Sequence, residues 1–403
     1  MKRTTKYAAV TRDEDNAADG RFKTASPTLI MLISSMYICP IRGLTGLEPP
    51  EADRLGKAAG IAKTLELDAL ELPVIEEAFI GAVRSKVARL DGLILALDRI
   101  EDAGLKVRLI VPAQRVLGLY WVPPYLAGAV PDPGAPLVFV DRKVRNLRPF
   151  DWWSDPSIIS DRIKIFREVI SALHGHPAIS DWIILDHTLK WARPEPHAAD
   201  IFLKSIVAEI REKDERGSIY LGVGWSEFLA PDLVLSLVRQ VDGLRMGGLD
   251  SPPPGMVKDR RLSQELLAAA YLGALAQWLF ECPVDMELGW GAWDPNDDFE
   301  EIVEAGTQAS ARGLSGITWL NLQDPELQLH SHPPWNLRPN LTTAGLLNRA
   351  GEPREGIETL LGQIRSTKTM DDPNDFIDLS RDDYLDDPPT HLHRLWDHFR
   401  ESL

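Results

Sequence analysis

The stretch RLSQELLAAAYLGALAQWLFECPVDMELGW (residues 261–290) decides the fold class of this chain. Residues 263–280 have the length and composition of a helix, and residues 284–287 form a short run that ends in an acidic side chain. Short β-like runs that alternate with longer helical runs are typical of βα units and of a parallel sheet. The stretch therefore predicts one helix followed by one buried parallel strand.

The same alternation extends along most of the chain. The predicted strands are 29–34, 69–74, 107–112, 182–186, 219–223, 243–246, 284–287 and 316–320, and the predicted helices are 50–65, 82–103, 156–174, 197–213, 231–240, 263–280 and 298–312. Eight such units over about 300 residues fit the usual size of a (β/α)8 barrel. We therefore predict an α/β fold, a single-domain TIM barrel. A doubly wound open sheet is the second choice, because no GxGxxG motif follows the first strand.

Three segments are expected along the chain. Residues 1–25 are polar and predict a flexible N-terminal arm, residues 26–365 form the barrel, and residues 366–403 form an acidic C-terminal tail. Within this tail, the middle is expected to be extended. The stretch THLHRLWDHFRESL (390–403) predicts a short amphipathic helix that docks on the barrel.

Charge and composition limit the partners. The net charge of −16 over 403 residues disfavours nucleic acid and anionic membranes. The two cysteines, Cys39 and Cys282, have no metal-binding spacing, and the histidines have no strong ligand spacing, so we expect no metal. No cofactor is expected either. The apolar run at 28–41 is too short to span a bilayer, and without a signal peptide a cytoplasmic location is expected. The 12 tryptophans fit a carbohydrate partner, because indole faces stack on sugar rings.

Chemically active side chains are expected at the carboxyl ends of the barrel strands, where barrel enzymes keep their active sites. Strand seven ends in Glu287, and strand four ends in Asp186 and His187. An aromatic wall is expected from Trp319 together with at least one of Trp225, Trp290 and Trp293. Further polar candidates follow strands five and eight: Glu227, Asn321 and Asp324. Each of these has a plain structural alternative, such as an ion pair at the rim, a turn cap or core packing.

Four motifs, in order, resemble the clan-A glycoside hydrolases of the cellulase and β-mannanase-like families, over about residues 28–362. They are LHGHPAISDWIILDH (173–187), PVDMELGW (283–290), RGLSGITWLNLQD (312–324) and TTAGLLNRAGEPREGIETL (342–360). The resemblance implies that Glu287 is the nucleophile of a retaining reaction on a β-linked glycoside. It also places Trp319 in the family's tryptophan position. From their places after the barrel strands, Trp225, Trp290 and Glu227 are predicted to contact the sugar together with Trp319.

The chain departs from this family at three places. In the family, strand four ends in Asn-Glu, with the glutamate as acid/base, whereas Asp186 and His187 stand here. The strand-two arginine is missing, and so is the His-x-Tyr of strand six, near residues 247–249. A retaining pair needs two carboxyl groups about 5–5.5 Å apart. His187 could donate the proton, since a neighbouring carboxylate would favour its charged form, and Asp186, Glu195 and Glu227 are the other candidates.

Three hypotheses follow. The first is a glycoside hydrolase or transglycosidase, retaining, with Glu287 as nucleophile. The second is a catalytically degenerate barrel that binds carbohydrate without hydrolysing it. The third is metal-assisted chemistry at Asp186, His187, His330 and His332, whose spacing does not favour a metal site.

Overall fold

The computed structural model describes residues 31–37, 49–76, 83–141, 143–247, 249, 252–257, 261–290, 299–333 and 335–403. The predicted arm, 1–25, lies outside the described residues. The described part, from Met31 to Leu403, belongs to one compact unit.

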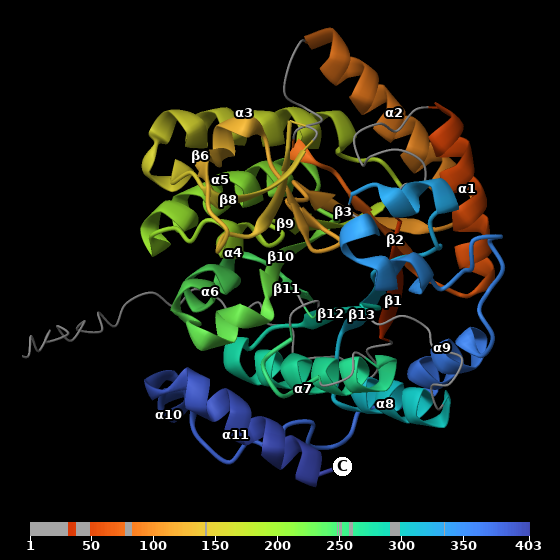
Figure 1. Cartoon of the computed structure of the whole chain (residues 1–403), viewed down its shortest axis with the longest axis vertical. Coiled ribbons are helices and arrows are strands. Elements are labelled where there is room, and N and C mark those ends of the chain that lie inside the picture. The colour runs from red at the N-terminus through yellow and green to blue at the C-terminus, as the bar shows by residue number, and fades with distance from the viewer. Residues whose placement is uncertain are drawn as a thin grey trace, which may run out of the picture. The chain divides into compact units, whose positions relative to one another are not determined.

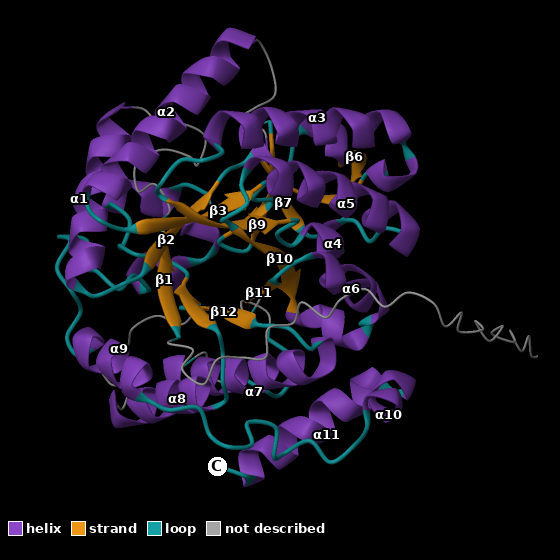
Figure 2. Cartoon of the chain, turned by 180° about the vertical axis from the view of Figure 1, so that it is seen from behind, coloured by secondary structure: helices purple, strands orange, loops and turns teal. Residues whose placement is uncertain are grey.

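Eight parallel strands close into a barrel at the centre of this unit (Figure 2). Around the barrel the order is β1-β13-β12-β11-β10-β9-β3-β2. The strands are β1 (Leu32–Met36), β2 (Ala69–Pro73), β3 (Lys106–Val111), β9 (Ile179–Ile184), β10 (Ser218–Gly224), β11 (Gly243–Gly247), β12 (Val284–Leu288) and β13 (Gly316–Trp319). The predicted TIM barrel is confirmed, and closure of the sheet between β1 and β13 rules out the doubly wound alternative.

Helices surround the barrel, as both views show (Figures 1 and 2). They are α1 (Pro49–Thr64), α2 (Val83–Asp102), α3 (Pro156–Leu173), α5 (Pro196–Lys213), α6 (Asp232–Leu237), α7 (Leu262–Phe280), α8 (Phe299–Ala311) and α9 (Ile357–Ser366). The start of α3 shows how the sequence sets such bounds. Asp155 caps the helix by accepting the backbone N–H groups of Ser157 and Ile158, and Pro156 takes the first turn, where no N–H is needed.

A second, smaller sheet is inserted between β3 and α3, where the sequence had suggested no elements. Its strand order is β4-β5-β7-β8-β6, with β4 (Arg115–Val116), β5 (Leu119–Trp121), β6 (Ala127–Pro131), β7 (Leu137–Val140) and β8 (Lys143–Pro149). Because β4 begins soon after β3 ends, its first residue, Arg115, lies near the carboxyl ends of the barrel strands.

The C-terminal tail covers α7 (Figure 1). The predicted docking helix is confirmed as α11 (Pro388–Glu401), whose Trp396 and Phe399 rings contact the ring of Tyr271. The prediction that the middle of the tail is extended was wrong in part. It contains the helix α10 (Arg381–Asp386), which begins at a capping box formed by Ser380 and Asp383. None of the helices in the described ranges is both long and apolar enough to cross a membrane.

Candidate functional site

The interior of the barrel is charged. Side chains alternate between the two faces of a strand, and barrel interiors are usually filled by branched apolar residues. In β12, Val284, Met286 and Leu288 alternate with Asp285 and Glu287. The same alternation places Glu71 on β2, Arg108 on β3 and Arg245 on β11, all of them fully buried. These five side chains form the polar interior on which the candidate site is built.

Arg245 joins the groups that end strands four and seven. Its Nη1 lies 2.5 Å from Oε2 of Glu287 and 3.5 Å from Oδ1 of Asp186. Its Nη2 donates to Oε2 of Glu71 at 2.9 Å. The structure therefore brings Glu287 and Asp186 together around one guanidinium, which comes from strand six and not from strand two.

The turn after β9 aims Asp186 at this guanidinium. Leu185 and His187 both have left-handed backbone conformations, with φ of 55° and 51°. Such conformations are costly for residues other than glycine and gather at functional sites. A Cβ on Gly222 of β10 would lie 2.5 Å from the Cα of Asp186, so the neighbouring strand admits the turn only because it has a glycine there.

His187 faces Glu287 across Gly247 of β11. A Cβ built on Gly247 would lie 3.0 Å from Nε2 of His187 and 3.1 Å from Oε1 of Glu287. The missing His-x-Tyr of strand six therefore leaves a bare backbone where these two side chains approach. Nδ1 of His187 makes no hydrogen bond within the described residues.

Glu287 is also held by Trp290. The indole N–H of Trp290 donates to Oε1 of Glu287 at 2.9 Å. Glu265 on α7 in turn accepts the backbone N–H groups of Gly289 (2.7 Å) and Trp290 (3.0 Å). The helix that precedes β12 therefore orients the loop that positions the Glu287 carboxylate.

The environment separates the two titratable groups that end strand four. Burial, together with the nearby carboxylates of Glu287 and Glu71, raises the pKa of Asp186 to about 7, although Arg245 opposes this shift. Burial, with the positive charges of Arg115, Arg245 and Lys190, lowers the pKa of His187 well below its ordinary value. The expectation that a neighbouring carboxylate would keep His187 charged is therefore wrong, because desolvation and the nearby cations outweigh that attraction.

The predicted aromatic residues lie in different surroundings. Trp319 is buried, and its indole N–H donates to the carbonyl of Ala344 at 2.9 Å. Trp225 is half-buried at the start of the turn after β10. Trp290 is buried beside Glu287, with the guanidinium of Arg115 5.6 Å from the centre of its ring. Trp293 lies outside the described residues, and the aromatic wall stays a prediction.

The other predicted acids are less well placed. Glu227 is buried, with its pKa raised by burial, and it pairs with Arg193 at 3.5 Å. Glu195 is exposed at the start of α5. Asn321 and Asp324 are buried after β13, where Asp324 pairs with Arg354.

Within the described ranges, the four residues of the metal-assisted hypothesis do not form a group that could hold a metal ion. The metal-like group found there is Asp98, Glu101 and His176, on the outer surface of the barrel. Asp186, His187, His330 and His332 are not among its members.

Several buried charged residues were missed from the sequence, and four of them bear directly on the site: Glu71, Arg108, Arg115 and Arg245. A signal was present for three of them. In ALELP (69–73), KVRLIV (106–111) and GLRMG (243–247), one charged residue interrupts an apolar strand at a period-two position. Such a residue must face the barrel interior, since the other face is covered by helices. Arg115 had no comparable signal, because the sheet that places it was not recognised.

Solved structures with a similar fold were found at low sequence identity. A GH5_18 protein from Streptomyces cattleya, in complex with GlcNAc, superposes with a TM-score of 0.66 at 14% identity, over 84% of this chain and 80% of that one. The fold shared by the two proteins is the (β/α)8 barrel. The exo-β-1,4-mannosidase Op5Man5 from Opitutaceae bacterium strain TAV5 gives 0.63 at 16% identity, over 84% of this chain and 60% of that one.

A third similar barrel is a GH5_18 protein from Bifidobacterium longum subsp. infantis, with a TM-score of 0.62 at 12% identity over 84% of this chain and 80% of that one. No family model and no curated protein matches the chain. The comparisons therefore show a shared barrel fold, and the chemistry of this chain has to be argued from the side chains present.

Proposed function

We propose that this barrel is a retaining β-glycosidase with Glu287 as nucleophile and Asp186 as proton donor. The observation that supports this most is the shared guanidinium of Arg245. Oε2 of Glu287 and Oδ1 of Asp186 lie 2.5 and 3.5 Å from the same nitrogen, so they are no more than about 6 Å apart. Retaining pairs are separated by about 5–5.5 Å and inverting pairs by about 6.5–9.5 Å. The upper limit of about 6 Å between these two oxygens therefore favours retention.

The two carboxyl groups have environments suited to opposite roles. Glu287 receives a guanidinium and an indole N–H, both of which bind the carboxylate form. Asp186 has a pKa of about 7, so a large fraction of it is protonated near neutral pH. A pair of acids whose surroundings push their protonation apart is the usual arrangement of acid and nucleophile.

The proposed chemistry has two steps. In the first, Glu287 attacks the anomeric carbon, the glycosidic C–O bond breaks, and Asp186 gives its proton to the departing oxygen. In the second, the Asp186 carboxylate takes a proton from water, which attacks the same carbon and releases Glu287. His187 stays neutral and offers Nε2 to a sugar hydroxyl.

For the substrate, we propose a neutral β-linked glycoside or oligosaccharide, with β-mannosides the first to test. Two of the similar barrels are a GH5_18 protein bound to GlcNAc and an exo-β-1,4-mannosidase. The net charge of −16 disfavours nucleic acid and anionic membranes as partners. The reaction needs no cofactor.

A second candidate function is carbohydrate binding without hydrolysis. The burial of Glu287, which is 3% exposed, favours this candidate. Both carboxylate oxygens of Glu287 also have partners, Oε2 with Arg245 and Oε1 with Trp290. The two candidates share the ligand and differ in whether a covalent intermediate forms.

The deciding experiment is covalent trapping. The protein is incubated with 2-deoxy-2-fluoro-β-mannosyl and β-glucosyl fluorides, and its intact mass is measured. We expect one added glycosyl group on the peptide that contains Glu287, and no label on Glu287→Gln. Absence of label, with calorimetric binding of a β-mannoside retained, would establish the binding protein in place of the enzyme.

A further inference from the structure

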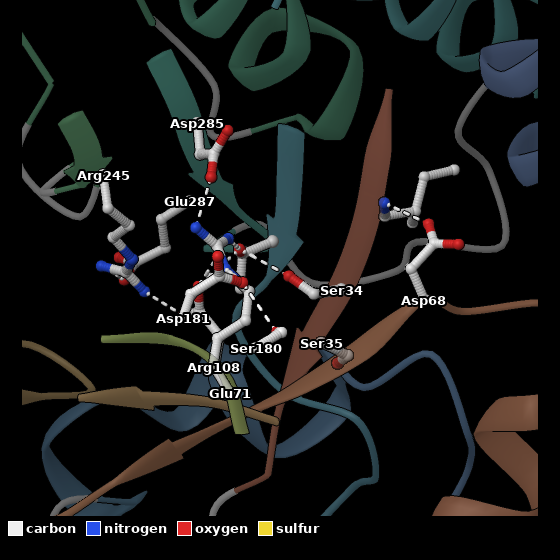
Figure 3. Close-up of polar contacts among 12 residues, drawn as sticks. Ser34, Ser35, Asp68, Glu71, Arg108, Ser180, Asp181, Arg245, Asp285 and Glu287 are labelled. Atoms are coloured by element: carbon white, nitrogen blue, oxygen red, sulfur yellow. Dashed lines mark hydrogen bonds and ion pairs between the residues drawn. The ribbon is translucent and has the colours of Figure 1, made fainter. Parts of the chain in front are cut away.

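A continuous series of buried ion pairs runs through the barrel toward the site (Figure 3). Arg108 pairs with Asp285, with Asp181 (3.4 Å) and with Oε1 of Glu71 (3.2 Å). Glu71 then pairs through its other oxygen with Arg245. We call Asp181, Asp285, Arg108 and Glu71 the core charge series. It ends at the guanidinium that Glu287 and Asp186 share.

Stability does not account for the core charge series. A buried ion pair gains little over apolar residues of the same volume, and replacing such a pair is often neutral or stabilising. The charges are also unbalanced, because five carboxyl groups share two guanidiniums in these ion pairs and Arg115 adds only one further positive charge near Asp186. The carboxyl groups are Glu71, Asp181, Asp186, Asp285 and Glu287, and the guanidiniums are Arg108 and Arg245. Because the cations are fewer than the carboxyl groups, a carboxyl group that lies further from a guanidinium is the one that keeps its proton.

We propose that Glu71 and Arg108 are positioning residues that set how Arg245 is divided between Asp186 and Glu287. The inference rests on the proposed function, in which Asp186 must keep a proton while Glu287 must not. Neither Glu71 nor Arg108 is assigned a contact with the substrate. They act through Arg245, which lies between them and the two carboxyl groups.

The geometry gives each residue a direction. Glu71 holds Nη2 of Arg245 at 2.9 Å and keeps the guanidinium away from Asp186, whose distance of 3.5 Å is the longest of the three contacts. Arg108 draws on the charge of the same carboxylate through its other oxygen, Oε1. Loss of the Glu71 carboxylate therefore frees Arg245 for Asp186. Loss of Arg108 leaves Glu71 with Arg245 and the hydroxyl of Thr318, and draws the guanidinium further from Asp186.

The charge of Glu71 acts on Asp186 in the same direction as the geometry. The groups whose charges act on Asp186 are Arg245 from β11, Glu287 from β12, Glu71 from β2 and Arg115 from β4, and the ring of neutral His187 lies beside it. Among them, Glu71 favours the protonated form of Asp186. Glu71→Gln therefore lowers the pKa of Asp186, and Arg108→Gln raises it through the position of Arg245 alone.

The sign of the pH effect follows from the role of Asp186 as acid. A general acid works when protonated, so activity falls as pH rises through the pKa of Asp186. We expect the alkaline limb of kcat/KM to move down by about one pH unit in Glu71→Gln and up by a similar amount in Arg108→Gln. If the two residues had a purely structural role, their substitution would lower activity without moving the alkaline limb. Alternatively, it would move the alkaline limb in the same direction in both variants.

The test uses the full chain and two readouts. The first is the pH profile of kcat/KM on an aryl β-mannoside. The second, independent of activity, is the infrared band of the protonated Asp186 carboxyl group, identified by its absence from Asp186→Asn. The matched control is Glu76→Gln. Glu76 is equally buried and pairs with Arg162 at 2.8 Å, outside the core charge series. This control should lose stability and keep the wild-type pH profile.

The outcomes separate the inference from the function. The inference is supported if the pKa of Asp186 shifts in opposite directions in Glu71→Gln and Arg108→Gln and does not shift in the control. If only one variant folds, that variant is sufficient to test the inference, because the direction of its shift is predicted. A wild-type infrared titration of Asp186 that both variants leave unchanged overturns it, as does a control that shifts equally. Failure of both variants to fold, while the control folds, also overturns it by showing a structural role. Absence of any wild-type turnover refutes the proposed function instead, while the infrared shift still tests the positioning.

Discussion

Asp186→Asn should make this protein more stable at alkaline pH, although it removes the proposed proton donor. Asparagine has nearly the shape of protonated aspartate and carries no charge. Asp186 is 1% exposed, and burial is the main cause that raises its pKa from 3.8 to about 7. The wild-type protein therefore buries a charge at pH 8 that the variant does not have.

The size of the effect follows from linkage. A carboxyl group whose pKa is raised on folding contributes stability that is fully present below its unfolded pKa and is lost as pH rises through its folded pKa. A shift of about three pKa units corresponds to about 4 kcal/mol, at 1.36 kcal/mol per unit. The advantage of Asp186→Asn should be about 4 kcal/mol at pH 8 and about 2 kcal/mol at pH 5.

Urea unfolding at pH 5 and pH 8, followed by tryptophan fluorescence, measures this difference. The control is Asp155→Asn, at the exposed cap of α3, where hydrogen bonds from Ser157 lower the pKa of the carboxyl group. The free energy of unfolding of this control, relative to the wild-type protein, should not increase as pH rises. The same Asp186→Asn protein should lose about 10²–10⁴-fold in kcat/KM on an unactivated β-glycoside, and much less on one with an acidic phenol.

A stability difference that is the same at pH 5 and pH 8 would refute the reasoning. It would mean that Asp186 does not change protonation in this interval. Asp186 would then lose its assignment as the acid, and the proton donor would have to be sought elsewhere.

Three further predictions concern the surroundings of the site. Gly247→Ala should lower kcat by at least tenfold with little loss of stability, because its Cβ would lie about 3 Å from three site groups, whereas Gly60→Ala, with open space around it, should leave kcat unchanged. Trp290→Phe removes one hydrogen bond to Glu287 and should cost about tenfold to a hundredfold in kcat, measured on the same aryl glycoside. In a variant that lacks the other cysteine, Cys282 should resist iodoacetamide at pH 8 until the protein is unfolded, because burial raises its pKa to about 12; rapid labelling of the folded protein would contradict this.

The sequence by itself determined the barrel and the strand ends that hold the site. Apolar strand positions that alternate with helical runs leave few arrangements other than a closed parallel sheet, and eight units fill it. The ends of strands four and seven were visible as Asp186, His187 and Glu287, because a titratable side chain that closes an apolar run must face a polar mouth. Even the charged interior had a signal in strands such as VDMEL (284–288).

Only the tertiary structure decided how these groups act on one another. Arg245 and Glu71 are 174 residues apart, and no spacing in the sequence indicates that one guanidinium serves Glu71, Asp186 and Glu287. The protonation of Asp186 and His187 could not be predicted for the same reason. A pKa depends on burial and on charges within a few ångströms, and those neighbours come from strands that are distant in sequence and adjacent in the barrel.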